Sequence, residues 1–460
     1  MSRSLGLACL CLAWFAACGT SAPSSGAHDA HDAHDAHDAH HAKGGPAVAP
    51  KAKPAPLPQG TRRSPSPREA RVIEELMGSA ERVRGLQFKQ AVPVLVEDRD
   101  RITSYVETQI EDEELDRARV VYAALGLLAP DLDVRALLLR LMGEQVVGYY
   151  DAEAKHLVVR DDVMLAFARG DDANAEEGSD LSEARIVLVH ELVHALQDQH
   201  LQLFEHIKAE RDTDADNAFH ALVEGDATLA MIGYALEREH IPLERLTSNP
   251  AQVKSFSDVV RRSPLAGTEL EQAPAIVRVP LLSAYVDGLA FCASLHGAGG
   301  FAAIDRAHAQ PPVSSEQVLH PERFAHMDLP ETLTLPELPE LAAAGYELVR
   351  EDTLGELEIG VYFGQGSREA DAKRAADGWD GDRLRVYRSQ RDPPAVVWLS
   401  AWDSERDAQE AEQAAARVAT QTGTPAANRW QVVRNGKRLL ILRDLAPELR
   451  ARIPQLALNR

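Results

Sequence analysis

His190, Glu191 and His194 are the residues of this chain whose types and spacing most directly suggest chemistry. In a helix, two imidazoles four residues apart lie on one face, about 6 Å apart along the axis, and both can reach one metal ion. A carboxylate directly after the first histidine is placed to take a proton from water beside the metal and to pass it to a leaving amine. The pattern predicts a zinc site suited to hydrolysis.

The surrounding sequence predicts that these residues lie within a helix. Asp180-Leu181-Ser182-Glu183 has the pattern of a capping box. The apolar residues that follow give a wide stripe at helical spacing: Ile186, Val187, Val189, Leu192, Val193, Leu196 and Leu203. The alternative is a buried helix with two hydrogen-bonded core histidines. That alternative leaves Glu191 unexplained, because an unpaired carboxylate in an apolar helix is strongly destabilising.

A catalytic zinc ion needs a third protein ligand and an open fourth position. His200 follows His194 by six residues, which is the spacing of the metzincin pattern. In that pattern a glycine, three residues after the second histidine, breaks the helix and turns the last histidine back to the metal. Gln197 stands at that position here. We therefore expect the helix to continue and to carry His200 away from the metal.

Glu224, thirty residues after His194, is the second candidate for the third ligand. It lies in a predicted helix from Asn217 to Leu236. Gly225 and Asp226 are unusual inside a helix, where glycine costs up to about 1 kcal/mol. A close approach of two helices at a metal would explain Gly225, and a hydrogen bond to a ligand histidine would explain Asp226. The alternative is that Glu224 is a solvated carboxylate before an irregularity in the helix.

Residues 190–198, His-Glu-Leu-Val-His-Ala-Leu-Gln-Asp, resemble the active-site helix of gluzincin-type, thermolysin-like zinc metallopeptidases. The strand-like segments 148–151 and 156–160 resemble the strand that precedes this helix in small members of the class. The resemblance implies a zincin-like fold, with a downstream helical glutamate as third ligand. Carried over to this sequence, it makes His190, His194 and Glu224 the zinc ligands and Glu191 the general base. Asp198 becomes a residue that supports the ligands.

The sequence departs from this family at one position, and it does not identify one required residue. The thermolysin-like pattern has an aspartate four residues after the glutamate ligand, whereas this chain has Thr228 there, so we assign that supporting role to Asp226. Such enzymes also need a hydrogen-bond donor for the oxyanion, commonly tyrosine or histidine. Tyr285 and His320 are the candidates, and His220, one turn before Glu224, is a further one. Each has a structural role as its alternative.

The amino terminus predicts export and lipid anchoring. Residues 1–17 carry one cation, Arg3, followed by an apolar stretch with the features of a signal peptide. Phe15-Ala16-Ala17-Cys18 resembles a bacterial lipobox, so we expect cleavage before Cys18 and its lipidation; an ordinary signal peptidase site is the alternative. Because Gly19 rather than aspartate follows Cys18, we expect a lipid-anchored protein of the bacterial cell envelope, at the outer membrane and facing either side.

A low-complexity tether is predicted at residues 19–67. From His28 to His41 it repeats His-Asp-Ala, with six histidines and four aspartates, and residues 43–67 are rich in Pro, Ala and Lys. Without apolar residues the tract cannot form a core. Its imidazoles and carboxylates could bind divalent metal ions weakly, although a plain hydrophilic tether is the alternative.

Two domains are predicted after the tether. Residues 68–330 would form the mainly helical zincin-like domain with a small sheet, and the Pro-rich segment 329–341 would be a boundary. Residues 342–460 would form a small α+β domain of unknown role. Its predicted strands are 383–387, 396–402, 430–433 and 438–442, the last two joined by an Asn435-Gly436 turn. Asp403 would cap a helix that ends at Val418.

Composition restricts the class of partner. The chain has 49 Lys and Arg against 71 Asp and Glu, a formal net charge of −22, which argues against nucleic acid. Apart from the signal peptide we expect no long apolar run, so the protein would be attached to the membrane through its lipid alone. The expected function is zinc-dependent hydrolysis of a peptide or protein substrate. A non-catalytic zinc-binding lipoprotein and a structural surface module remain the alternatives.

Overall fold

The computed structural model describes residues 60–458, except 111, 144–145, 171–179, 250–251, 254, 256–268 and 422–428. Within this part of the chain the fold is α+β and mainly helical, with two small sheets, as the sequence predicts. The predicted signal peptide, the lipidation site Cys18, the tract from His28 to His41 and the tether up to residue 59 lie outside the described residues.

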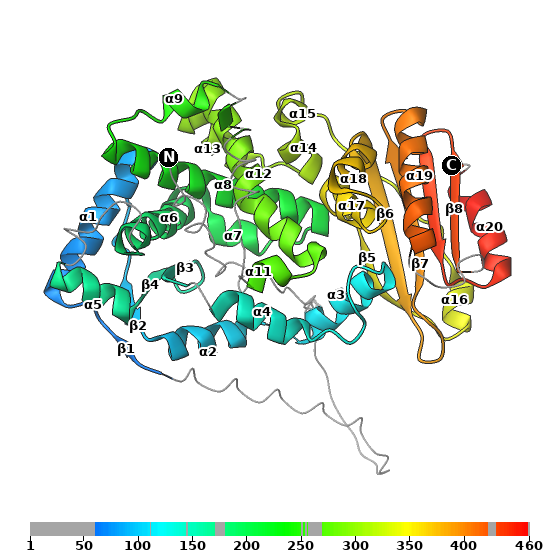
Figure 1. Ribbon diagram of the computed structural model, residues 1–460, viewed down its shortest axis with the longest axis horizontal. Coiled ribbons are helices and arrows are strands. Elements are labelled where there is room, and N and C mark those ends of the chain that lie inside the picture. The colour runs from blue at the N-terminus through cyan, green and yellow to red at the C-terminus, as the bar shows by residue number, and fades with distance from the viewer. Residues whose placement is uncertain are drawn as a thin grey trace, which may run out of the picture.

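The first sheet has four strands in the order β1-β2-β4-β3 (Figure 1). Its strands β2 and β4 are parallel, and the other pairs are antiparallel. Both strand-like segments at 148–160 are confirmed, as β3 and β4. The elements of this half are β1 (Arg62–Arg63), α1 (Pro67–Arg84), β2 (Val94–Glu97), α2 (Arg99–Gln109), α3 (Asp112–Ala124), α4 (Val134–Gly143), β3 (Gly148–Asp151), β4 (His156–Arg160), α5 (Asp161–Arg169), α6 (Asp180–Leu201), α7 (Leu203–Ile207), α8 (Thr213–Arg238), α9 (Glu244–Thr247), α11 (Glu269–Gln272), α12 (Ala275–Gly299), α13 (Phe301–Ala309), α14 (Ser315–Leu319) and α15 (Pro321–Ala325).

Helix α6 is the central element of this half. Its apolar side chains, among them Leu188 and Leu192, pack with β2, β4, α1 and α5 in one core. The helix runs unbroken from Asp180 to Leu201, through Gln197, as the absence of a glycine predicts. Because α8 and β3 also pack against α6, side chains on every face of its central turns are buried. A polar group on this helix is therefore removed from water and needs a partner.

Helices α8 and α12 approach each other at two glycines. A Cβ at Gly225 would lie 2.2 Å from the carbonyl oxygen of Gly288, and a Cβ at Gly288 would lie 2.1 Å from that of Ala221. The predicted close approach at Gly225 is therefore present, but its partner is α12 and not the histidine helix α6. Glu224 is the residue before Gly225 on α8, so this contact between α8 and α12 also fixes the position of Glu224.

We expect Gly225→Ala to destabilise the fold by about 3 kcal/mol or more, because the added methyl overlaps backbone atoms of a packed helix. Gly233→Ala on the same helix is the matched control, since its Cβ would meet nothing closer than a Leu243 methyl at 3.5 Å. That change should be neutral or stabilising by about 1 kcal/mol. Urea unfolding measures both; equal stability of the two variants would contradict the packing described.

Helix α12 corrects the prediction that no long apolar run follows the signal peptide. It is long and apolar enough to cross a membrane by length and composition, and half of its most apolar window is buried inside the protein. It packs along α8, and its buried residues Leu289, Phe291 and Cys292 belong to a shared core. These contacts are those of a core helix of the folded protein.

The second sheet has five antiparallel strands in the order β5-β6-β7-β9-β8. Side chains alternate across it, so that Trp398 packs toward α17, α18 and α19, whereas Val397 packs toward α20 on the other face. The elements of this half are α16 (Pro339–Ala343), β5 (Glu347–Asp352), α17 (Gly355–Gly364), α18 (Glu369–Ala376), β6 (Trp379–Arg388), β7 (Ala395–Trp402), α19 (Glu405–Gln421), β8 (Trp430–Asn435), β9 (Arg438–Arg443) and α20 (Pro447–Ala457).

Two local predictions in this half are wrong by one residue. The hairpin pairs Asn435 with Arg438, so its two turn residues are Gly436 and Lys437. The turn needs a positive φ at its first position, where glycine has φ 58°. Helix α19 is capped by Ser404, whose hydroxyl accepts from the Asp407 amide at 3.2 Å, whereas Asp403 pairs with Arg323.

The two halves share packed residues. Leu333, Leu335 and Leu338, from the Pro-rich segment predicted as a boundary, are buried against the second sheet. From the first half, α3 places Val121 and Ala124 in the core formed by α17, α18 and the second sheet. The segment has no regular structure until α16 begins at Pro339, but its leucines bury apolar surface, so it is packed on the protein and is not an exposed linker.

Candidate metal centre

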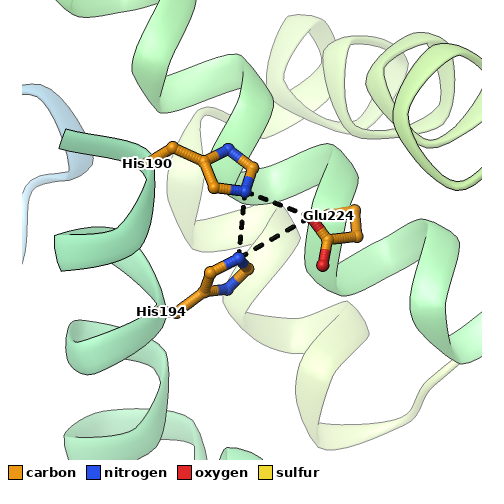
Figure 2. Close-up of side chains that lie close together, drawn as sticks. All are labelled: His190, His194 and Glu224. Carbon is orange, nitrogen blue, oxygen red and sulfur yellow. Dashed lines mark hydrogen bonds and ion pairs between the residues drawn. The ribbon is translucent and has the colours of Figure 1, made fainter. Parts of the chain in front are cut away.

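His190, His194 and Glu224 meet at the contact between α6 and α8 (Figure 2). The Nε2 atoms of the two histidines are 3.0 Å apart, and Glu224 Oε2 lies 3.1 Å from His190 Nε2 and 3.6 Å from His194 Nε2. All three residues are at most 3 % exposed. The arrangement in the structure is therefore the predicted one. Two imidazoles lie on one face of a helix, and a glutamate of another helix lies opposite them.

The geometry of this cluster fits a tetrahedral metal ion. Ligand atoms about 2.0 to 2.1 Å from zinc in a tetrahedron are about 3.3 Å from one another, close to the three separations here. Two imidazole nitrogens and a carboxylate oxygen form a ligand set that zinc accepts. Glu224 Oε1 is buried and has no hydrogen-bond partner among the described residues. An orphaned buried carboxylate oxygen is unusual, and a cation at the cluster would account for it.

The electrostatics of the cluster also favour a cation. Burial lowers the pKa of His194, but the charge and hydrogen bond of Glu224, together with the charge of Glu191 and a hydrogen bond to Gln197, raise that pKa to about 9. Conversely, burial raises the pKa of Glu224, but the charges and hydrogen bonds of His194 and His190 together hold that pKa well below the usual range. The carboxylate is therefore ionised and needs a positive charge beside it, supplied either by an imidazolium or by a metal ion with neutral imidazoles.

Glu191 is held at the edge of the cluster by strand β3. Its Oε2 accepts a hydrogen bond of 2.9 Å from the backbone amide of Tyr150. The carboxylate is buried on a helix of apolar neighbours, so this bond satisfies one of its oxygens and fixes its orientation. A carboxylate oriented in this way, on the residue after a candidate ligand, is available as a proton acceptor.

Asp198 is hydrogen-bonded to the side chain of the same tyrosine, Tyr150. The Tyr150 hydroxyl donates to Asp198 Oδ2 at 2.9 Å, and Lys155 Nζ lies 3.7 Å from that oxygen. Tyr150 is thereby attached to α6 twice, through its backbone at Glu191 and through its hydroxyl at Asp198. We conclude that Asp198 positions β3 against the helix, and through β3 it positions Glu191.

Asp226 supports a histidine, but through an intermediate residue. Gln197 accepts from His194 Nδ1 through Oε1 at 2.8 Å, and its Nε2 donates to Asp226 Oδ2 at 2.9 Å. Arg84 Nε lies 2.7 Å from Asp226 Oδ1, and His308 Nε2 lies 3.1 Å from Oδ2. The direct bond predicted from Asp226 to a ligand is therefore corrected. With Nδ1 donating to Gln197, Nε2 is the His194 nitrogen that faces Glu224 and would bind a metal.

We expect Gln197→Leu to weaken zinc binding by about 10- to 100-fold, because the His194 ring loses the bond that fixes its orientation and tautomer. Gln199→Leu is the matched control: Gln199 lies two residues along α6 and bonds to Lys89 and Gln90. Competition with a metal-binding dye measures the affinity of each folded variant. If Gln197→Leu binds zinc as tightly as the wild type, Gln197 does not support the ligand His194.

The other predicted candidates lie in different surroundings. His200 Nε2 donates to the carbonyl oxygen of Gln87 at 2.7 Å, away from the cluster, as expected for an unbroken helix. His220 Nδ1 lies 3.7 Å from the carboxylate of Asp216, which precedes it by one turn on α8. The Tyr285 ring stacks on His190, with centroids 6.1 Å apart, so this candidate donor is beside the cluster. His320 is not brought to the cluster, because its Nε2 bonds to Glu356 of α17 at 3.1 Å.

Gln197, Arg84 and His308 support the site in the structure but were not predicted from the sequence. The sequence pattern identifies Gln197 only as the residue that stands in place of a glycine. Its position three residues after His194, on the same helix face, was a usable signal. Arg84 and His308 come from α1 and α13, and no local pattern connects them with α8.

Comparison with known proteins gives one match. A family model described as a domain of unknown function, DUF8575, matches residues 345–445, which span β5 to β9 and the helices between them. None of the residues of the metal centre lies in this region. No curated protein and no solved structure matches the chain.

Proposed function

We propose that this chain is a zinc-dependent peptidase in which His190, His194 and Glu224 hold the ion and Glu191 is the general base. The observation that carries the proposal is the meeting of these three side chains in a buried cluster, with the oriented carboxylate of Glu191 beside the first ligand. A purely structural zinc site has no need of such a base, so Glu191 favours an enzyme over a non-catalytic zinc-binding protein.

Each side chain has a defined task in this proposal. A zinc ion supplies Lewis acidity, which acidifies water and polarises a carbonyl group. Glu191 accepts the proton of the attacking water and returns it to the amine that leaves. The amide of Tyr150 keeps the Glu191 carboxylate in one orientation. Tyr285, stacked on His190, is the residue we assign to donate a hydrogen bond to the oxyanion.

We further propose that the enzyme acts in the bacterial cell envelope, anchored through lipid on Cys18. The support is the sequence of residues 1–19, with its apolar signal segment and lipobox. Membrane attachment through several acyl chains is in practice permanent. The predicted tether ends at residue 67, but Arg62–Arg63 form β1 and α1 begins at Pro67, so the part of the tether before β1 would hold the folded protein away from the bilayer.

The test of the activity is the incubation of the detergent-solubilised protein with a complex peptide mixture, followed by mass spectrometry of new termini. We expect new amino termini that disappear when a chelator removes zinc and return when zinc is restored. Termini that persist at full chelation would contradict zinc-dependent cleavage. A zinc-loaded protein that generates none would favour the non-catalytic zinc-binding alternative.

A further inference from the structure

A second group of metal-binding side chains lies away from the first, between the two halves of the protein. His320 follows α14, Glu356 lies in the first turn of α17, and Asp377 follows α18. Helices α14 and α17 are packed against each other, which brings His320 to Glu356 (Figure 1). Each residue offers one ligand atom, and these three atoms lie within 4.8 Å of one another.

The distances in this group are compatible with one shared ion. Glu356 Oε1 lies 3.1 Å from His320 Nε2, and Asp377 Oδ1 lies 3.8 Å from the same nitrogen. Zinc ligands in a tetrahedron are about 3.3 Å apart, so Asp377 would have to move about half an ångström closer to His320 to share an ion with it. The Asp377 side chain is 60 % exposed, which leaves it room to move.

Glu356 provides an independent sign that a ligand is needed. Its side chain is 8 % exposed, and its Oε2 is buried without a hydrogen-bond partner among the described residues. Only one oxygen of the carboxylate, the one that contacts His320, is paired. A buried carboxylate oxygen without a donor is destabilising, and a cation held by both oxygens of Glu356 would remove that cost.

The charges around the group are mostly negative. Glu322 lies 3.9 Å from His320 Nδ1, and the buried Glu316 of α14 interacts electrostatically with Glu356. Arg323 is the neighbouring cation, and its guanidinium is already shared by Glu316, Asp328 and Asp403. A divalent cation would therefore relieve the repulsion among these carboxylates.

We propose that His320, Glu356 and Asp377 bind a second zinc ion. An imidazole with two carboxylates suits zinc, whereas calcium and magnesium prefer oxygen ligands alone. Glu356 and Asp377 belong to the region that matches the domain of unknown function, and His320 lies outside it. The ion would connect the two halves of the chain. This site gives His320 a role other than oxyanion donor, and it does not depend on the proposed peptidase activity.

The test counts zinc ions per chain in the full-length protein. Because the histidine tract could bind zinc itself, all variants carry alanine at its six histidines between residues 28 and 41; we call this background the His-tract variant. We expect two zinc ions per chain in the His-tract variant after dialysis against zinc, and one in His320→Ala or Asp377→Asn. His326→Ala is the matched control: His326 is exposed, six residues from His320, and bonds to the Glu322 carbonyl. It should retain two.

The Glu224→Ala background separates this site from the first. There we expect one remaining zinc ion, which Asp377→Asn removes, and a zinc-dependent rise in melting temperature that the same substitution abolishes. Asp377 is exposed, so Asp377→Asn is expected to fold, and circular dichroism checks this. An unchanged zinc count in folded His320→Ala and Asp377→Asn, or an equal loss in His326→Ala, would overturn the second site.

Discussion

Glu191→Gln should abolish most peptide hydrolysis while zinc binding and the fold are retained. The amide has the shape of the carboxylate and can still accept the Tyr150 backbone hydrogen bond, but it cannot take a proton from water. Loss of a general base costs about 10²- to 10⁴-fold in rate. Cleavage of a fluorogenic peptide chosen from the observed cleavage sites, at matched zinc content, measures the effect.

Glu183→Gln is the matched control for this substitution. Glu183 lies on the same helix, about two turns before Glu191, and it is only partly buried. Glu183→Gln removes the same negative charge from α6. The rate of peptide hydrolysis should stay within about twofold of the wild type, because substitutions outside the buried core have small effects. A Glu191→Gln variant that cleaves as fast as Glu183→Gln would show that Glu191 is not the base.

Glu224→Ala should lower the zinc affinity of the first site by more than about 100-fold. Outer-shell partners already contribute about 10- to 100-fold, and Glu224 is a direct ligand in this account. The substitution also leaves His190 and His194 without the carboxylate that faces both. Zinc affinity is measured by dye competition in the His-tract variant with Asp377→Asn, so that neither the tract nor the second site contributes.

His200→Ala distinguishes the two possible third ligands. His200 donates to a backbone carbonyl outside the cluster, so its loss should leave zinc affinity unchanged. If zinc is lost equally in both variants, or only in His200→Ala, the third ligand is His200 and the metzincin-like arrangement holds. Circular dichroism of each variant shows whether a loss of zinc comes from unfolding.

The parts of the site that sequence could predict are those with short-range patterns. The four-residue spacing of His190 and His194 fixes one helix face, and the absence of a glycine at position 197 keeps α6 straight and His200 outside the site. Gly225, next to Glu224, correctly predicted a close approach of two helix backbones, although the partner is α12 and not the histidine helix α6. In each case one local rule determines the geometry.

The parts that could not be predicted depend on contacts between distant segments. Arg84 reaches Asp226 across 142 positions of the chain, and His308 reaches it across 82. These contacts arise only when α1, α8 and α13 pack together. The pairing of His320 with Glu356 likewise needs the two halves to meet. A single sequence carries no periodicity that would show such pairs.

The most direct test of the central claim is a zinc titration of the metal-free His-tract variant with Asp377→Asn, in which bound zinc and peptide hydrolysis are measured in the same samples. We expect the rate to rise in proportion to bound zinc and to reach its plateau at one ion per chain. Hydrolysis by the metal-free protein, or one tightly bound zinc ion without hydrolysis of the peptide mixture, would contradict a zinc peptidase centred on His190, His194 and Glu224.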